Sequence, residues 1–515
     1  MLSLNKYLNL KGFLLSLLAT YSLIGNAGKP VDVEYEASVL ANWSTGDLAP
    51  YMLGSWRYGR VTGASGIWQD GRLEKRMSLD TRFSWGAGVE YIAGYGTAAP
   101  YALYDEPTNS WGERHNRQAP LRLHQLYGEV KYRGVYLLAG MKERHSGIVD
   151  DTMSSGDLTR SNNARPIPGV AAGFVDFQDI PFTNGWVQID GEIMYGRMFD
   201  GDMREKTFNY YTGVFTDKMY YTYKRCYFRT KPSQPLSVTV GMQTGAFFGG
   251  TTQKYRRGRY IETIERKFHI RDLWDMFFPS EGGEDYYKGG TLGSWDFKAR
   301  YAFADGSTLS AYFEWPWEDG SGIGRMNGFD GVWGLQYNFA TPGIVSKVLV
   351  EYLDFTNQSG PIHWSPDDSP GTDITGKATG SDSYYNNEYY GPYTNYGMSI
   401  GTPFLVSPLY NSNGYPQYLH NRARGFHAAV SGNISPEWEY TAKFSYQRAG
   451  GNGFVPARRI SDTSAGVFAR WTPQGGLDGL SLTAEAAFDA GKLRGNNFGA
   501  MVGISYRGNF TFGKK

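Results

Sequence analysis

The chain has 515 residues, with 51 Lys and Arg against 50 Asp and Glu and a formal net charge of +1. This balance excludes the strongly basic surface that a nucleic-acid partner requires. The only cysteine, Cys226, excludes an internal disulfide. The 7 histidines show no metal-ligand spacing, so we expect neither a metal centre nor a cofactor.

The composition favours many short strands and turns. Glycine is frequent, with 67 residues, and the aromatic share of 16% comes mostly from 39 Tyr and 14 Trp. Glycine suits bends, and aromatic side chains suit pleated surfaces. The mean hydropathy of −0.45 would fit a soluble protein. It also fits a transmembrane β-barrel, because only every second residue of such a strand faces lipid.

The first 27 residues are typical of a cleaved secretory signal peptide. Lys6 and Lys11 precede the apolar run "GFLLSLLATYSLIG", and small residues follow at Gly25 and Ala27. This order of basic, apolar and small residues indicates export, and the run is shorter than the roughly 20 residues of a spanning helix. The alternative interpretation is an N-terminal membrane anchor.

Strict apolar and polar alternation begins soon after this region and recurs along the chain. In "WVQIDGEIMYG", Gln188, Asp190 and Glu192 alternate with apolar neighbours. Successive strand side chains point to opposite faces, so each such segment predicts a strand with one polar and one apolar face. The clearest segments cover residues 33–41, 79–91, 186–196, 295–303, 308–315, 438–447, 481–490 and 502–512.

Two fold classes alternate in this way: a soluble β-sandwich and a membrane barrel. Charged residues occupy mid-strand positions in segment after segment, and tryptophan recurs at the ends of apolar faces, at Trp295, Trp315 and Trp438. Aromatic residues at strand ends are typical of the two membrane interfaces. We therefore predict an all-β, transmembrane outer-membrane β-barrel in which residues 28–515 form a single domain. It has about 18 antiparallel strands, with short turns at one end and long extracellular loops at the other.

The connection between residues 251 and 290 contains two noteworthy stretches. "YRRGRY" supplies Arg256, Arg257 and Arg259, which we take as candidates for binding an anionic saccharide through charge-assisted hydrogen bonds. The alternative is a solvated loop or a contact with lipopolysaccharide phosphates. "FHIRDLWDMFF" predicts a short amphipathic helix, which we expect to pack into the barrel mouth as part of a lid.

The stretch between residues 354 and 424 is the longest without clear alternation, and it is rich in tyrosine. A tyrosine ring stacks on sugar rings while its hydroxyl bonds to sugar hydroxyls. The alternative is that these side chains only fold the loops against one another. The candidate glycan-binding tyrosines are Tyr384, Tyr385, Tyr389, Tyr390, Tyr393 and Tyr396.

An enzymatic function has little support in the sequence. His145 lies near adjacent Asp150 and Asp151, and a carboxylate pair beside a histidine could activate water. However, neither a GxSxG nucleophile motif nor a phosphate-binding P-loop occurs. We expect the protein not to be an enzyme.

One stretch, "SSGDLTRSNNARPIPGVAAGFVDF" from Ser154 to Phe177, fits neither a simple strand nor a turn. It resembles the signature of the capsule assembly Wzi family in the form found in the Bacteroides group. Further similar stretches are "STGDLAPYMLGSWRYG", "DIPFTNGWVQIDGEIMYG", "YKRCYFRTKP", "VLVEYLDFTNQSG" and "SIGTPF". The residues of the central stretch that we expect to shape its backbone are Gly156, Asp157, Arg165, Pro166 and Pro168.

The resemblance implies a Gram-negative outer-membrane barrel that attaches capsular polysaccharide or exopolysaccharide to the cell, lectin-like, without enzymatic activity or cofactor. Its other contacts would be outer-membrane lipid and lipopolysaccharide. Enteric members carry an N-terminal periplasmic helical segment, whereas here alternation starts at Val33, so any plug of the lumen must be built otherwise. No binding residue transfers from the family, so the tyrosine and arginine candidates rest on their chemistry alone.

The alternative function is a passive channel for saccharides or small solutes. Its lumen would be lined by charges of both signs, which could equally pair and close it. The sequence leaves open the identity of the polysaccharide, the state of the pore, the oligomeric state and any protein partner. The expected lumen charges are Asp80, Arg82, Asp190, Glu192, Lys298 and Arg300.

Overall fold

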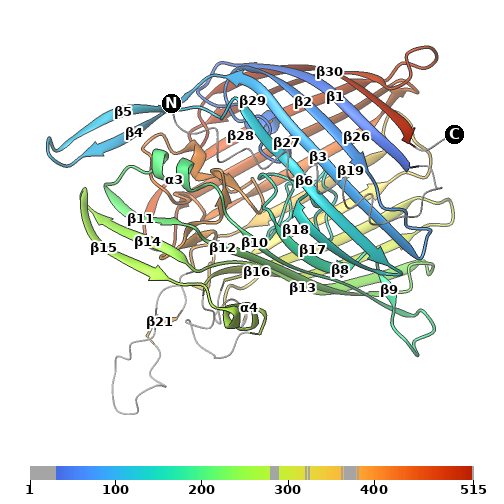
Figure 1. Cartoon of the computed structure of the whole chain (residues 1–515), viewed down its shortest axis with the longest axis horizontal. Coiled ribbons are helices and arrows are strands. Elements are labelled where there is room, and N and C mark those ends of the chain that lie inside the picture. The colour runs from blue at the N-terminus through green and yellow to red at the C-terminus, as the bar shows by residue number, and fades with distance from the viewer. Residues whose placement is uncertain are drawn as a thin grey trace.

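The computed structural model shows a closed antiparallel β-barrel (Figure 1). It describes residues 31–278, 289–318, 322, 325–360, 363–364, 378–379 and 382–512. The predicted signal peptide, residues 1–27, lies outside this part of the chain. Each wall strand pairs with its neighbours along the chain, and β1 pairs with β30 from Val31↔Phe512 to Ser44↔Gly499, which closes the ring.

The wall sheet contains 19 strands. Because β8 and β9 both pair with β10, they occupy one position, and the ring has the 18 strand positions that the sequence predicts. The wall strands are β1 (Val31–Ser44), β2 (Gly66–Lys75), β3 (Phe83–Gly96), β6 (Leu121–Tyr132), β7 (Val135–Met141), β8 (Gly169–Phe174), β9 (Gln178–Asp179), β10 (Val187–Arg197), β12 (Tyr220–Thr230), β13 (Leu236–Phe248), β16 (Gly290–Ala302), β17 (Thr308–Trp317), β18 (Gly331–Asn338), β19 (Lys347–Asp354), β26 (Ala423–Ser435), β27 (Trp438–Gly451), β28 (Pro456–Trp471), β29 (Leu480–Gly491) and β30 (Asn497–Phe512).

The alternation seen in the sequence separates an outer from an inner face. On β10, Asp190 and Glu192 are buried inside the ring, and Asp190 pairs with Arg225 at 3.0 Å. On β16, Asp296 is buried whereas its neighbour Phe297 is exposed on the outside. An exposed apolar face around a closed barrel matches a hydrocarbon environment. Inner charges are met by ion pairs, as at Asp190, or by hydrogen bonds, as between the Tyr227 hydroxyl and Asp296 at 2.6 Å.

The two ends of the barrel differ. Short turns, such as that from Tyr132 to Val135, connect strands at the end where Val31 and Phe512 lie. Most connections at the opposite end are long. Outward aromatic rings pack together near both ends: Trp438 with Trp471 at the short-turn end, and Trp333 with Phe313, 3.8 Å between centroids, toward the other. This pattern matches the aromatic girdles expected at membrane interfaces.

The long connections carry the remaining elements. No helix in the described ranges has the length and apolarity to cross a membrane. The elements are α2 (Tyr51–Gly54), β4 (Ala99–Asp105), β5 (Ser110–Asn116), α3 (Gly201–Thr207), β11 (Thr212–Asp217), β14 (Gly250–Arg256), β15 (Arg259–Arg266), α4 (Ile270–Phe277), β20 (His363–Trp364), β21 (Ala378–Thr379), β22 (Asn386–Asn387), β23 (Gly391–Pro392), β24 (Thr394–Asn395), β25 (Met398–Ser399) and the 3-10 helix η2 (Pro408–Tyr410).

Two expectations from the sequence need correction. The helix predicted in "FHIRDLWDMFF" is present as α4, but it contacts outward-facing wall residues, among them Lys224, and does not enter the barrel mouth. A helix with one apolar side satisfies that side equally well on the outer wall. Asp80 and Arg82 lie in the exposed β2–β3 turn rather than in the lumen, because β3 begins only at Phe83.

Candidate functional site

Three of the long connections fold back into the barrel, and we call residues 45–65, 142–168 and 382–422 the lumen plug. Residues 153–164 are all buried. The backbone N–H of Ser155 donates to the Glu351 carboxylate on β19 at 2.8 Å, and the Met153 carbonyl lies 2.9 Å from the His427 ring on β26. The lumen at this level is therefore occupied by the protein's own chain.

Asp157, one of the residues of the central family-like stretch, organises the turn at the centre of the plug. Its carboxylate accepts the N–H groups of Thr159 and Arg160 at 2.8 and 2.9 Å, and the side-chain amide of Gln243 at 2.9 Å. Gly156 precedes it with φ of +101°, and a Cβ there would lie 2.9 Å from the Pro403 ring. A tight left-handed turn against a neighbouring loop requires glycine at this position.

Arginines of the plug neutralise acids of the wall. Arg144 and Arg160 each form an ion pair with Glu192 at 2.7 Å, and Arg160 also stacks on the Tyr223 ring. Arg165 lies over the Tyr396 ring at 4.1 Å. Of the charges expected to line a channel, Glu192 pairs with arginines of the plug, Asp190 pairs with Arg225 of the wall, and the Lys298 ammonium donates to the Ile148 carbonyl of the plug at 2.6 Å.

The prolines of the same stretch shape its return to the wall. Pro166 is buried, and the Pro168 carbonyl accepts the N–H of Arg197 at 3.0 Å immediately before β8 begins. Because proline lacks an N–H, it fits positions where the chain leaves regular strand pairing. The five family-like residues therefore all lie in the plug or at its exit, as structural elements.

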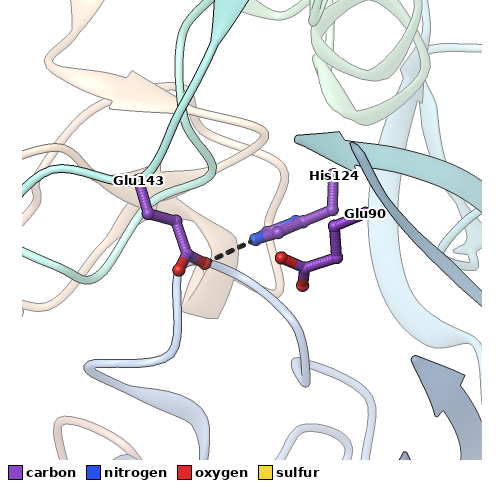
Figure 2. Close-up of side chains that lie close together, drawn as sticks. All are labelled: Glu90, His124 and Glu143. Carbon is purple, nitrogen blue, oxygen red and sulfur yellow. Dashed lines mark hydrogen bonds and ion pairs between the residues drawn. The ribbon is translucent and has the colours of Figure 1, made fainter. Parts of the chain in front are cut away.

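A second cluster joins two parts of the plug to the wall. Figure 2 shows Glu90, His124 and Glu143 close together, with the His124 ring 2.9 Å from the Glu143 carboxylate. Their ligand atoms lie within 4.8 Å of one another, a spacing that a metal ion could use. However, the Arg60 guanidinium bonds to both carboxylates and to Asp70, and so already supplies the positive charge. We interpret the group as an ion-pair cluster.

Two acids of the 142–168 connection, Glu143 and Asp150, hold it in place as charged groups. Burial disfavours ionisation of Glu143, but Arg60 and His124 outweigh it and lower its pKa to about 2. Burial also acts against Asp150, whereas hydrogen bonds from Thr152 and Lys347 lower its pKa to about 2. Both carboxylates are therefore charged at neutral pH and hold the plug through cations.

The predicted tyrosine cluster divides into buried and accessible members. Tyr384, Tyr385, Tyr390 and Tyr393 are buried, at 1 to 4% exposure. The Tyr385 hydroxyl donates to the Leu158 carbonyl at 2.6 Å, and the Tyr393 hydroxyl to the Thr159 carbonyl at 3.0 Å. Burial raises the pKa of both hydroxyls, which stay protonated as donors. These contacts connect the 382–422 connection to the turn around Asp157.

Tyr389 and Tyr396 remain partly accessible. Tyr389 is 39% exposed, and the cations of Lys254 and Arg266 lie 5.0 and 4.9 Å from its ring. The Tyr396 hydroxyl donates to the Phe199 carbonyl at 3.1 Å. Of the six predicted tyrosines, Tyr389 is thus the only exposed one, and it lies at the long-loop end.

A small pocket of about 80 Å³ lies among the long connections, and we call it the rim pocket. Aromatic rings and polar groups line it together: Arg204 is fixed there by Asp200 at 2.8 Å and by the Thr394 carbonyl at 2.7 Å. The aromatic and polar side chains that line it include Tyr101, Asn116, Arg204, Phe208, Tyr390 and Tyr415. Flat apolar rings beside amide and guanidinium donors can bind a sugar ring by stacking and hydrogen bonding.

The β14–β15 hairpin, residues 250–266, is called the arginine arm here. The three predicted arginines lie at its tip. Arg256, Arg257 and Arg259 are all exposed. Arg259 forms an ion pair with Glu106 of the β4–β5 hairpin at 3.0 Å. In Figure 1 both hairpins project from the long-loop end. The arm therefore displays positive charge to the outside of the barrel.

The residues considered for hydrolysis lie in the plug. His145 is 2.9 Å from Asp151, so these two do meet, whereas Asp150 contacts Lys347 at 3.0 Å and Gln336 at 3.1 Å. The bond to Asp151 raises the pKa of His145. Both aspartates serve contacts inside the chain, which favours a structural role for them.

Comparisons with known proteins place the fold among outer-membrane barrels. No family model matches the sequence, and no curated protein matches it. Among solved structures, Wzi of Escherichia coli is described as an outer membrane protein involved in group 1 capsule assembly and a carbohydrate-binding β-barrel. It is 14% identical, with a TM-score of 0.52, over 95% of this chain and 86% of that chain. At this identity the match shows a Wzi-like fold.

Two porin structures match with lower scores. OccK5 of Pseudomonas aeruginosa is 9% identical over 93% of this chain and 98% of that chain, with a TM-score of 0.45. OccAB2 of Acinetobacter baumannii is 11% identical over 93% and 98%, with a TM-score of 0.47.

Sequence reasoning did not identify most of the rim pocket. Tyr390 was a candidate, but Tyr101, Asn116, Phe208 and Tyr415 come from three different connections. Residues so far apart in sequence meet only through the barrel topology. The one local signal was the "NSNGYPQY" composition at residues 411–418, where loop-forming residues surround a tyrosine.

Proposed function

We propose that this protein is a surface barrel of the Gram-negative outer membrane that binds capsular polysaccharide or exopolysaccharide and retains it at the cell. The rim pocket would hold sugar rings, and the arginine arm would attract acidic groups of the same polymer. The observation that carries the proposal is the rim pocket, in which Tyr101, Phe208 and Tyr415 lie beside Asn116 and Arg204.

The chemistry of the long-loop end supports this assignment. Sugar rings have apolar faces and hydroxyl edges, so they suit a pocket of aromatic rings with fixed amide and guanidinium donors. A small pocket binds one repeat weakly. A polymer that contacts many copies gains avidity, by about 10²- to 10⁴-fold when sites are linked. The filled lumen below also favours binding over passage.

The test is binding of the purified barrel to the organism's own surface polysaccharide. We expect the wild type to retain polymer, and Tyr415→Ala to retain several-fold less, because it removes a half-buried ring of the pocket. Phe182→Ala is the matched control, since Phe182 is a fully exposed aromatic residue in the β9–β10 turn. Failure of the wild type to bind, or equal binding by Tyr415→Ala, would contradict the proposal.

A deletion strain gives the cellular counterpart of this test. Loss of a retaining barrel should release polymer into the medium while synthesis continues. Unchanged cell-bound polysaccharide in that strain would argue against the proposed function. The binding assay and the deletion assay are independent, because one reports affinity and the other attachment.

A passive channel is the second candidate function, and one observation favours it. A cavity of about 590 Å³ lies in the lumen between the plug and the strands β26 to β29, and Arg57, Lys443 and Glu485 are among its lining residues. A solute-sized space on one side of the plug would serve a channel if the plug moved. Planar-bilayer recordings separate the candidates: steady open currents favour a channel, and a silent bilayer favours the binding barrel.

A further inference from the structure

The segment between β15 and β16 contains α4, which is seated on the outer wall of the barrel. The Tyr195 hydroxyl of β10 donates to the Leu273 carbonyl at 2.6 Å. The Lys224 ammonium of β12 donates to the Met276 and Phe277 carbonyls at 3.0 and 2.8 Å. In Figure 1, α4 lies beside the wall near β13 and β16.

The wall side of α4 is well packed. Met276 is buried against Ala246 and Phe248 of β13, with Leu273 beside them. Phe268, just before the helix, packs on the Tyr220 ring at 4.8 Å between centroids. These contacts fix the height of the helix along the barrel.

The side of α4 away from the wall divides into two arcs. Ile270 and Trp274 are 79% and 65% exposed, and Phe277 is exposed as well; their spacing of 4 and 3 residues puts them on one apolar arc. The polar arc carries Arg271, which pairs with Asp275 at 3.6 Å. An isolated helix in water would gain nothing from displaying such large apolar side chains.

The position of α4 along the wall relates its apolar arc to the lipid-facing surface of the barrel. Between α4 and the short-turn end of the barrel, the outer face carries Phe228 of β12 and Leu236 and Val240 of β13. These side chains are exposed and apolar, as lipid-facing residues are. Nearer the long-loop end, the outward-facing residue of β12 is the charged Lys224, whose ammonium is bound by the helix. The apolar arc of α4 thus continues the lipid-facing band at its upper edge.

We propose that α4 lies in the boundary between headgroups and acyl chains of the outer leaflet, with Ile270, Trp274 and Phe277 inserted into lipid. Helices with one apolar and one charged arc adopt this position, and tryptophan is enriched at this depth. The occupant of the apolar arc is lipid. A second copy of the chain is the rejected occupant, and the experiment below distinguishes it.

A lipid-anchored α4 would also position the neighbouring β14–β15 hairpin. Only Lys267, Phe268 and His269 separate α4 from the end of β15. A helix anchored in the leaflet would hold the arginine arm at a fixed height above the membrane surface. The inference rests on the transmembrane barrel and is independent of glycan binding.

The test uses the single cysteine of the chain. In a Cys226→Ser background, Ile270→Cys is labelled with an environment-sensitive fluorophore and reconstituted into phosphatidylcholine vesicles that contain nitroxide-labelled lipids. Ile270 is mostly exposed, so its replacement leaves the wall contacts intact, and heat-modifiable migration in gels confirms folding. Arg271→Cys on the polar arc and Arg257→Cys at the arm tip are the controls.

We expect a blue-shifted emission at position 270 and quenching by lipid nitroxides several-fold stronger than at positions 271 and 257. Aqueous iodide should quench the labels in the opposite order. Strong iodide quenching at position 270 would overturn the inference, because the arc would then face water. Protection from both quenchers, with a concentration-dependent cross-link through position 270, would overturn it in favour of a second copy.

Discussion

The 142–168 connection and the arginine arm both belong to long connections and contain several arginines. The first lies inside the barrel, whereas the second projects into solvent. Arg144 and Arg160 of the 142–168 connection form ion pairs with Glu192 of the wall. Arg256 and Arg257 of the arm are exposed. The difference lies in what each connection meets. A segment that turns into the lumen meets unpaired acids of the inner face, and a segment that turns outward meets water. Arginine content alone therefore does not identify a binding loop.

Among changes to the plug, removal of Arg60 should lower the free energy of unfolding most. Arg60→Ala leaves Glu90 and Glu143 buried without their cation, and breaking a buried pair in this way costs roughly 3–5 kcal/mol. We expect the free energy of unfolding in urea to fall by about that amount. Arg257→Ala, its counterpart on the arm, should change it by less than about 0.5 kcal/mol. Equal effects of the two variants would remove the distinction between plug and arm.

A buried and an exposed tyrosine allow the same comparison, with a smaller expected change in stability. Tyr385→Phe removes the hydroxyl that donates to the Leu158 carbonyl and leaves a buried acceptor unsatisfied, which costs about 1–3 kcal/mol. The exposed Tyr389→Phe should leave stability within about 0.5 kcal/mol. Urea titrations of both variants measure this. A Tyr385→Phe protein as stable as wild type would show that the plug does not depend on these bonds.

Acid should loosen the plug before it affects the arm. The folded pKa of Glu143 and of Asp150 is about 2, below the unfolded values of about 4.3 and 3.9. A lowered folded pKa gives a stabilisation that is complete above the unfolded value and is lost as pH falls toward the folded one. The protection of the amide hydrogens of residues 142–168, taken relative to the intrinsic exchange rate at each pH, should therefore fall between about pH 4.5 and 2. Glu143→Gln should show lower protection already at neutral pH, and protection in the wild type that does not change with pH would contradict the assignment.

The smallest effect concerns the arm. Arg257→Gln should weaken binding to an acidic polysaccharide by a few-fold, since exposed charge pairs contribute about 0.2–1 kcal/mol. The loss should shrink as salt rises, because screening weakens exposed interactions. Binding isotherms at low and high salt measure it, with a neutral polysaccharide as the control. A salt-independent loss would indicate a change of structure instead of charge.

The sequence by itself determined the wall. Alternation depends only on neighbouring residues, so segments such as 295–303 and 438–447 correspond to β16 and β27 with the expected inner and outer faces. The number of strands and the difference between short turns and long connections followed from the same pattern. The start of β3 was placed too early, at Leu79 instead of Phe83, because the exposed turn continues the alternation.

Only the tertiary structure decided where the connections go. Tyr384, Tyr385 and Tyr393 have the same side chain and the same kind of neighbours as Tyr389, yet three are buried and one is accessible. The helix of residues 270–277 was predictable from its periodicity, but its place on the outer wall was not. Inward, outward and wall-bound positions are set by contacts with strands far away in the chain. Local composition contains no information about those contacts.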